Sequence, residues 1–202
     1  MEAKYLTAVQ LSALRSVMDD ASWLLLWVML ETGLRVGDAV SLKRAQVRKD
    51  GIHYKAQKTG KRGIAPISAA LYSALKGDGS QGYIFKGRQE GTHLSRQAAW
   101  KRIKTAAARC GIDAEGVSPH AMRKVFAVET FREKGMQATR EALQHSSKDT
   151  TEIYAYADWN TGEKARLPLL RSDLKTIVAM VIKALPDLGK MREEEAQKKK
   201  TK

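Results

Sequence analysis

Residues 118–156 read SPHAMRKVFAVETFREKGMQATREALQHSSKDTTEIYAY, and the rest of the chain is interpreted outward from this stretch. The apolar spacing of its first half predicts a helix that is pinned into a core by Val125, Phe126, Val128 and Phe131. His120 and Arg123 are three residues apart, so they project from one face of that helix. A guanidinium anchored in this way is a rigid fork of donors that suits phosphate oxygens.

The second half of the stretch carries another histidine and two tyrosines. His145 follows a short second helical segment, and Tyr154 comes nine residues later, after a Ser-Ser-Lys-Asp-Thr-Thr run. That run contains N-cap residues and predicts a new short helix that bears Tyr154. Tyr156 is two residues further on and points in another direction, so only one of the two tyrosines can face a shared ligand. For isolated histidines, a structural role would be the better interpretation.

Composition indicates an anionic partner and a single domain with a tail. The chain has 202 residues and a net charge of +14, from 36 Lys and Arg against 22 Asp and Glu, which favours nucleic acid. The longest apolar run, residues 23–30, is too short to span a bilayer, and no signal segment opens the chain. The one cysteine, Cys110, excludes an internal disulfide framework and is expected to be a small core residue. We therefore expect a cytosolic protein.

Two helices are predicted before residue 34. Thr7 and Gln10 form a capping box at the start of the first helix. The second helix is predicted to run from a cap at Ser22 to a stop at Gly33. Because its sequence WLLLWVMLETG is apolar nearly all round, this helix should lie in the centre of the core.

An arginine and an aspartate follow the buried helix directly. Arg35 comes just after Gly33, and Asp38 is three residues further on. We expect Asp38 to orient Arg35 through a charge-assisted bond that leaves donors free for a ligand. The alternative on these residues alone is an ordinary surface ion pair.

Residues 52–68 predict a β-hairpin with a basic tip. Apolar and polar residues alternate on both sides of the turn sequence KTGK. Lys58, Lys61 and Arg62 at this tip either form a solvated loop or enter a DNA groove. A short helix is expected at residues 69–75, and the glycine-rich stretch after it lacks the strand-then-helix pattern of a nucleotide cradle.

A basic helix is predicted from Arg96 to Cys110, capped by Ser95. One basic face alone is usually just solvated. Together with the net charge and the hairpin tip, it favours contacts with backbone phosphates. The predicted DNA-binding side chains are Lys61, Arg62, Arg96, Lys101, Arg102, Lys104 and Lys124.

The composition changes after residue 156. A linker is followed by an amphipathic helix, residues 174–185, that ends at Pro186, and the last dozen residues are charged. We expect three parts: one folded domain at 1–160, a linker and amphipathic helix at 161–190, and a disordered charged tail at 191–202. The fold class expected is mainly α with a small antiparallel β-sheet or hairpin (α+β).

The chain contains Arg, Lys, His-x-x-Arg, His and Tyr in that order. This order resembles the pattern of the tyrosine recombinase (phage integrase) family over about residues 6–156. The motifs that carry the resemblance are TGLRVGD, KTGK, SPHAMRK, LQHSS and TTEIY. The resemblance implies that residues 1–160 form a catalytic DNA-breaking and rejoining domain with the family's fold. The same resemblance implies that Asp38 supports the catalytic residues. It also implies a catalytic set of Arg35, Lys58, His120, Arg123, His145 and the nucleophile Tyr154. The nine-residue gap from His145 favours Tyr154 over Tyr156.

The resemblance implies a site-specific DNA recombinase or integrase that works through a 3′-phosphotyrosyl intermediate. The two arginines would hold the non-bridging phosphate oxygens, and Lys58 would protonate the leaving 5′-oxygen. His120 would assist proton transfer, and His145 would hydrogen-bond the phosphate. Because the phosphotyrosyl link conserves bond energy, no metal, ATP or other cofactor is expected. The expected partners are double-stranded DNA and further copies of the chain in a tetramer on DNA, without a membrane, in the cytoplasm at the nucleoid.

Three positions depart from the family pattern, and two other functions stay open. Asp38 stands where glutamate is common, Gln144 where glycine usually precedes the histidine, and Lys124 where a second histidine often follows the arginine. Members usually carry an N-terminal DNA-clamping domain, so we expect either a short member or a fragment. Helix 174–185 is hypothesised to dock on a neighbouring protomer. The alternatives are a type IB topoisomerase-like relaxing enzyme and a basic DNA-binding protein without catalysis.

Overall fold

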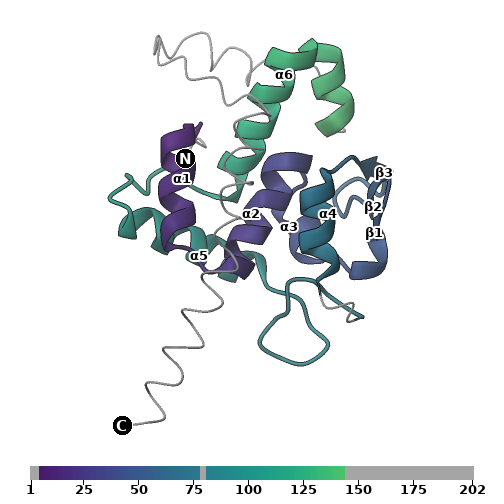
Figure 1. The fold of residues 1–202 in the computed structure, drawn as a ribbon, viewed down its shortest axis with the longest axis horizontal. Helices are drawn as coiled ribbons and strands as arrows, with labels where there is room; N and C mark the ends of the chain where they lie inside the picture. The colour runs from purple at the N-terminus through teal and green to yellow at the C-terminus, as the bar shows by residue number, and fades with distance from the viewer. Residues whose placement is uncertain (1–4, 78–80, 144–202) are drawn as a thin grey trace. The chain divides into compact units, whose positions relative to one another are not determined.

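Helix α2, Asp20–Thr32, lies at the centre of the part of the chain that the computed structural model describes, residues 5–77 and 81–143 (Figure 1). Nine of its thirteen residues are buried, as its largely apolar sequence predicts. The predicted cap at Ser22 is wrong, because Asp19 is the N-cap and its carboxylate accepts the Ser22 backbone N–H at 2.8 Å. The Ser22 hydroxyl also donates to Asp19, so a residue two positions inside the helix reinforces the cap.

Three other helices begin as their local sequences predict. Helix α1, Ala8–Val17, has the Thr7–Gln10 capping box. Helix α4, Ala69–Lys76, is capped by Ser68, and helix α5, Arg96–Arg109, is capped by Ser95. In each case the hydroxyl accepts a backbone N–H that would otherwise lack a partner in the first turn.

A small antiparallel sheet of three strands lies beside the helices. The strands are β1 (Val47–Arg48), β2 (Gly51–Lys55) and β3 (Arg62–Ala65), in the order β1-β2-β3. The hairpin of β2 and β3 confirms the predicted one, and β1 is an addition that follows a 3-10 turn at Arg44–Gln46. Ile52 pairs with Val47 and with Ala65, and all three side chains are buried. This pairing turns one face of the sheet toward the core and fixes the position of the loop between β2 and β3.

Helix α6, Pro119–Leu143, packs against α2. It is kinked at Gly135, where the backbone is not helical. The two main helices approach each other where α2 ends. Gly33 caps α2 in the left-handed conformation (φ 64°), and a Cβ there would come within 2.3 Å of the Phe126 ring. Only glycine allows both the turn and this contact. The close packing brings the start of α6 next to the chain that follows α2.

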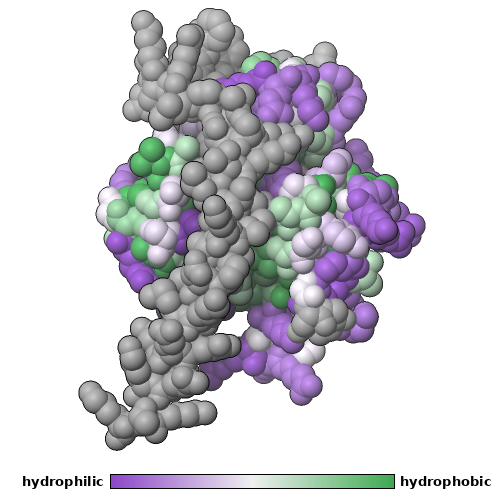
Figure 2. Space-filling model, in the orientation of Figure 1, coloured by the Kyte–Doolittle hydropathy of each residue, from purple (hydrophilic) through white to green (hydrophobic). Residues whose placement is uncertain are grey.

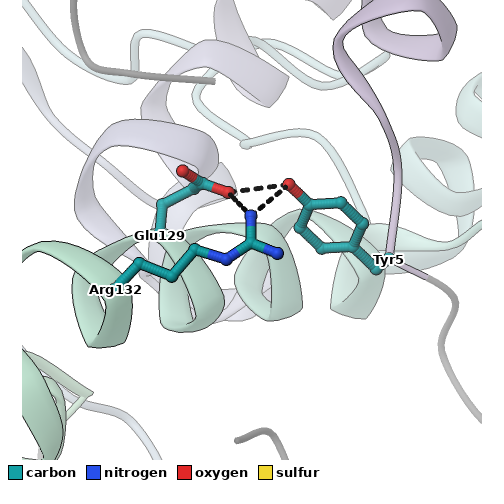
Figure 3. A network of polar contacts seen from close by, with 3 residues as sticks. All are labelled: Tyr5, Glu129 and Arg132. Carbon is teal, nitrogen blue, oxygen red and sulfur yellow. Dashed lines mark hydrogen bonds and ion pairs between the residues drawn. The ribbon is translucent and has the colours of Figure 1, made fainter. Parts of the chain in front are cut away.

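A polar network fastens the beginning of the described chain to α6 (Figure 3). The Tyr5 hydroxyl donates to Glu129 at 2.7 Å, and Arg132 pairs with the same carboxylate at 3.0 Å. Partial burial and the adjacent carboxylate raise the pKa of Tyr5, and burial also raises the pKa of Glu129. The phenol is therefore a proton donor throughout the neutral range, and it holds the segment before α1 against α6.

Several predictions concern residues outside the described part of the chain. These are His145, the two tyrosines, the linker and amphipathic helix, and the charged tail. Within the part that is described, no helix is both long and apolar enough to cross a membrane. The described helices and the small sheet agree with the predicted α+β class.

Candidate active site

Four of the predicted catalytic side chains line one pocket of about 460 Å³: Arg35, Lys58, His120 and Arg123. They come from separate elements: the junction between α2 and α3 (Val36–Val40), the β2–β3 loop, and the first turns of α6. Three of the four carry a fixed positive charge at neutral pH. A concave site in which cations converge from distant segments suits an anionic ligand.

Arg123 is the most rigidly held cation of the pocket. Its side chain is only 4% exposed. One terminal nitrogen donates to the carbonyl of Gly33, and the other donates to the carbonyl of Leu143 at 2.8 Å. These two carbonyls lie at the end of α2 and at the end of α6, so the guanidinium is oriented by both main helices. A fork held in this way presents its charge in a defined direction.

Arg35 is placed by the turn that ends α2. It follows Gly33 and Leu34 and is the N-cap residue of α3, with extended backbone (φ −66°, ψ 148°). Its side chain is half-buried, and it makes no hydrogen bond to any residue in the described ranges. Arg35 can therefore direct its donors to a ligand, while Arg123, which also lines the pocket, supplies a pre-oriented charge.

Asp38 has a different partner from the one predicted. Its carboxylate is 6% exposed and accepts the backbone N–H of Gln57 at 2.8 Å. Among the described residues, no hydrogen bond or ion pair joins it to Arg35, so the expected orienting bond is wrong. The buried carboxylate instead fastens α3 to the loop that carries Lys58. A buried acid needs such a donor, and here the donor is a backbone amide.

His120 lies at the start of α6, where it lines the pocket. Desolvation lowers the pKa of its imidazole, and the charges of Arg123, Lys124 and Arg35 lower it further. The ring is therefore neutral at pH 7 and has a nitrogen that can accept a proton.

One tyrosine of the small sheet lies within the electrostatic field of the pocket arginines. Tyr54 in β2 is half-buried, and its pKa is raised chiefly by burial. The charges of Arg123 and Arg35 oppose that rise, which places the ring within their field. No sequence pattern singles out Tyr54, since it is one alternating position of a predicted strand.

Five of the predicted DNA-binding residues lie on the hairpin or on α5. Lys61, in the β2–β3 loop, and Arg62, the first residue of β3, are both exposed. Figure 2 shows hydrophilic residues along the edge where β2 and β3 lie in Figure 1. Lys101 and Arg102 are exposed on α5, and Lys104 is half-buried with its ammonium donating to the carbonyl of Ala114.

Two residues depart from the expected surface. Lys124 is only 7% exposed, so it does not belong to the exposed basic surface that was predicted. Arg96 lies at the start of α5 and lines the pocket itself. The prediction placed it with the other helix cations, because the proximity of α5 to α3 is a tertiary contact that no local pattern reveals.

Two pocket residues were not identified from the sequence. Gln57 and Met29 line the pocket with the predicted set. Met29 is an ordinary apolar residue of α2, and Gln57 is an unremarkable polar residue beside Lys58. Within residues 5–77 and 81–143, no group of three or more His, Cys, Asp or Glu side chains is placed to hold a metal ion.

Comparisons with known sequences place this pocket in a family. The profile of the phage integrase family matches residues 4–160. A tyrosine recombinase XerD of Vibrio cholerae is 30% identical over 172 residues, which cover 76% of this chain and 57% of the relative. XerD of Rhizobium meliloti is 30% identical over 142 residues, covering 65% of this chain and 46% of the relative. The chain thus spans about half the length of the curated relatives it matches.

Solved structures share the fold. A crystal structure of XerA recombinase superposes with a TM-score of 0.65 at 22% identity, covering 82% of this chain and 67% of that one. A lambda integrase tetramer bound to a Holliday junction gives 0.63 at 18% identity, with 76% and 48% covered. The catalytic domain of bacteriophage HP1 integrase gives 0.59 at 23% identity, with 77% and 88% covered.

Proposed function

The chain belongs to the phage integrase family, and from that premise we propose that it cuts and rejoins DNA at specific sites through a 3′-phosphotyrosyl intermediate. The observation that carries the proposal is the pocket in which Arg35, Lys58, His120 and Arg123 meet. The guanidiniums can stabilise charge on the phosphate, the ammonium can donate a proton, and the neutral imidazole can accept one. Phosphodiester transfer needs these three functions.

In the proposed reaction, the phenol oxygen of Tyr154 attacks the scissile phosphorus. Arg35 and Arg123 neutralise the charge that develops on the non-bridging oxygens. As the bond between phosphorus and the 5′-oxygen breaks, the Lys58 ammonium gives that oxygen a proton. His120 takes up the phenol proton, and His145 hydrogen-bonds the phosphate. The reverse sequence, with a 5′-hydroxyl as nucleophile, rejoins the strand.

The proposed substrate is double-stranded DNA, and the proposed active form is a tetramer on DNA. The net charge of +14 and the exposed cations of α5 and the hairpin loop support contacts with backbone phosphates. Arg96 would bind a phosphate at the pocket rim, and Lys101 and Arg102 would bind phosphates further along the duplex. The protein would act in the cytoplasm, at the nucleoid.

The proposal is tested by incubating the protein with a nicked suicide duplex, which carries candidate attachment-site DNA, in the presence of EDTA. Denaturing electrophoresis should reveal a protein–DNA band that survives detergent. A DNA-binding protein without catalysis would give retardation on a native gel but no covalent band. A relaxing enzyme of the type IB class would also relax supercoiled plasmids that lack the site, and we expect no relaxation.

The low pKa of His120 predicts how cleavage depends on pH. The imidazole must be neutral to accept the phenol proton, and its pKa in the free protein lies below 6.5. Cleavage at subsaturating protein reports groups of the free enzyme. We therefore expect the rate to fall with acid, with a midpoint below 6.5, the ordinary pKa of a histidine. The measurement is the single-turnover rate between pH 5 and 8.

A His120→Asn variant serves as the control for this assignment. It should be slower than the native protein at pH 7, by about a hundredfold. It should also lose the acid limb of the profile, because the amide does not titrate. An unchanged acid limb in this variant would assign the titration to another group.

We also propose that the segment at 174–185 docks on a neighbouring protomer and couples protomers on DNA. Its apolar residues recur at helical spacing, which suits a groove on a partner. Removing residues from Ser172 onward should reduce the tetramer on DNA to smaller complexes in analytical ultracentrifugation. An unchanged assembly state would rule this docking out.

A further inference from the structure

The residue before Lys58 is attached to α3 through both its backbone and its side chain. The Gln57 backbone N–H donates to Asp38 at 2.8 Å. Its side-chain amide donates to the Gly37 carbonyl at 3.1 Å and to the Ser41 hydroxyl at 3.0 Å. Three hydrogen bonds therefore join the loop after β2 to α3 and its C-cap residue Ser41.

Lys58 itself has no comparable anchor. It is exposed, and its side chain makes no hydrogen bond or ion pair to any residue that the structure describes. The loop is closed by two backbone bonds, Ala56 to Lys61 and Gly60 to Ala56, both 2.8 Å long. These bonds shape the turn but do not attach it to the pocket wall. The attachment comes from Gln57 alone among the residues from 57 to 61.

The surface of α3 that Gln57 contacts leaves space for its side chain. Gly37 lies under the amide, and a Cβ at this position would stand 3.1 Å from the Gln57 side-chain oxygen. The Ser41 hydroxyl, which accepts from the amide, donates to the Gly37 carbonyl at 2.9 Å. The missing side chain at residue 37 thus leaves room for the glutamine at the pocket edge.

We infer that Gln57 is a positioning residue, which holds Lys58 on the leaving-group side of the pocket at a fixed offset from Arg35. The inference rests on the proposed function, in which the Lys58 ammonium protonates the departing 5′-oxygen. Without the three-bond attachment, the lysine would sample a wider volume and spend less time within reach of that oxygen. Small misplacements of a catalytic group can slow a reaction by up to about a hundredfold.

A substrate with sulfur in place of the bridging 5′-oxygen separates this role from a general structural one. A thiol has a pKa of about 8.5, whereas water, which stands for an alcohol, has one of about 15.7. A thiolate therefore leaves without a proton donor. A variant that only misplaces Lys58 should be slow on ordinary DNA and normal on the sulfur-containing DNA.

The experiment measures single-turnover cleavage of both suicide duplexes by the native protein, Gln57→Ala and Lys58→Ala. We expect Gln57→Ala to cut ordinary DNA about tenfold more slowly and sulfur-containing DNA at the native rate. Lys58→Ala should show a larger loss with the same recovery, and the double variant should be no slower than Lys58→Ala. Equal slowing of Gln57→Ala on both substrates, or no slowing on ordinary DNA, would overturn the inference.

Two further variants complete the test. A Cβ at residue 37 would stand 3.1 Å from the Gln57 side-chain oxygen, so Gly37→Ala forces the amide to shift. This variant should reproduce the selective loss to a smaller degree, so the test does not depend on how Gln57→Ala folds. Gln46→Ala is the matched control, because this glutamine also donates to a backbone carbonyl, that of His53 at 2.9 Å, away from the pocket. It should cut both substrates normally. If the native protein cuts neither, the proposed function fails and the inference with it; if it cuts both, the Gln57 result decides the inference alone.

Discussion

Replacing Tyr154 with phenylalanine is expected to abolish the covalent protein–DNA adduct, whereas Tyr156→Phe is expected to keep it. The change removes one oxygen atom, which is the proposed nucleophile. Loss of a nucleophile typically lowers a rate by at least about a thousandfold. The measurement is adduct formation on a nicked suicide duplex, followed by denaturing electrophoresis.

DNA binding provides the control for both tyrosine variants. Retardation of the duplex on a native gel should be the same for the native protein, Tyr154→Phe and Tyr156→Phe, because neither phenol is needed for contacts with backbone phosphates. An adduct that persists in Tyr154→Phe and disappears in Tyr156→Phe would transfer the nucleophilic role to Tyr156. The two residues are two positions apart in the sequence, so only one of them is expected to face the phosphate, and the experiment identifies which.

Arg123→Lys is expected to lose both activity and stability. A lysine ammonium is a point charge and cannot reproduce the fork that reaches the Gly33 and Leu143 carbonyls. One buried carbonyl loses its partner, which costs about 1–3 kcal/mol. Cleavage should fall by about a hundredfold to a thousandfold, since removing one oxyanion-hole donor costs that much in acyl transfer. Urea unfolding and single-turnover cleavage measure the two effects.

Arg35→Lys is the matched variant at the same pocket. Arg35 is half-buried and has no bond to the residues described, so its replacement leaves no carbonyl unsatisfied. We expect a similar loss of cleavage with a change in unfolding free energy below about 0.5 kcal/mol. Equal destabilisation by both substitutions would show that the carbonyl contacts of Arg123 do not contribute to stability as argued.

The sequence predicted those parts of the fold that depend on local chemistry. The capping box at Thr7, the cap at Ser95 and the stop at Gly33 are each decided by residues within one helical turn. The central place of α2 followed from an apolar sequence that leaves no polar face for solvent. The hairpin followed from alternation on both sides of a turn sequence.

Contacts between distant segments were the part that the sequence could not supply. The Asp38 carboxylate was expected to bind Arg35, three residues away, and instead accepts a backbone N–H nineteen residues away. A backbone amide has no sequence signature, so this partner could be identified only in three dimensions. Lys124 reads as a surface cation, but α6 is buried on most sides of its first half, and the lysine is buried with it.

The candidate site was found in the sequence through the order of motifs rather than through geometry. That order identified Arg35, Lys58, His120 and Arg123, which the structure brings together in one pocket. It could not identify Arg96 or Gln57, which reach the pocket because α5 and the hairpin loop both meet α3.

The central claim is that this pocket transfers a phosphodiester from a 5′-oxygen to a tyrosine. The most direct measurement is the polarity of the trapped adduct, determined with suicide duplexes labelled at either end of the cut strand in the presence of EDTA. We predict that the 5′-labelled fragment becomes attached to the protein through its 3′-phosphate, while the 3′-labelled fragment is released with a free 5′-hydroxyl. Attachment of the 3′-labelled fragment, or cleavage with no attachment at all, would contradict the account.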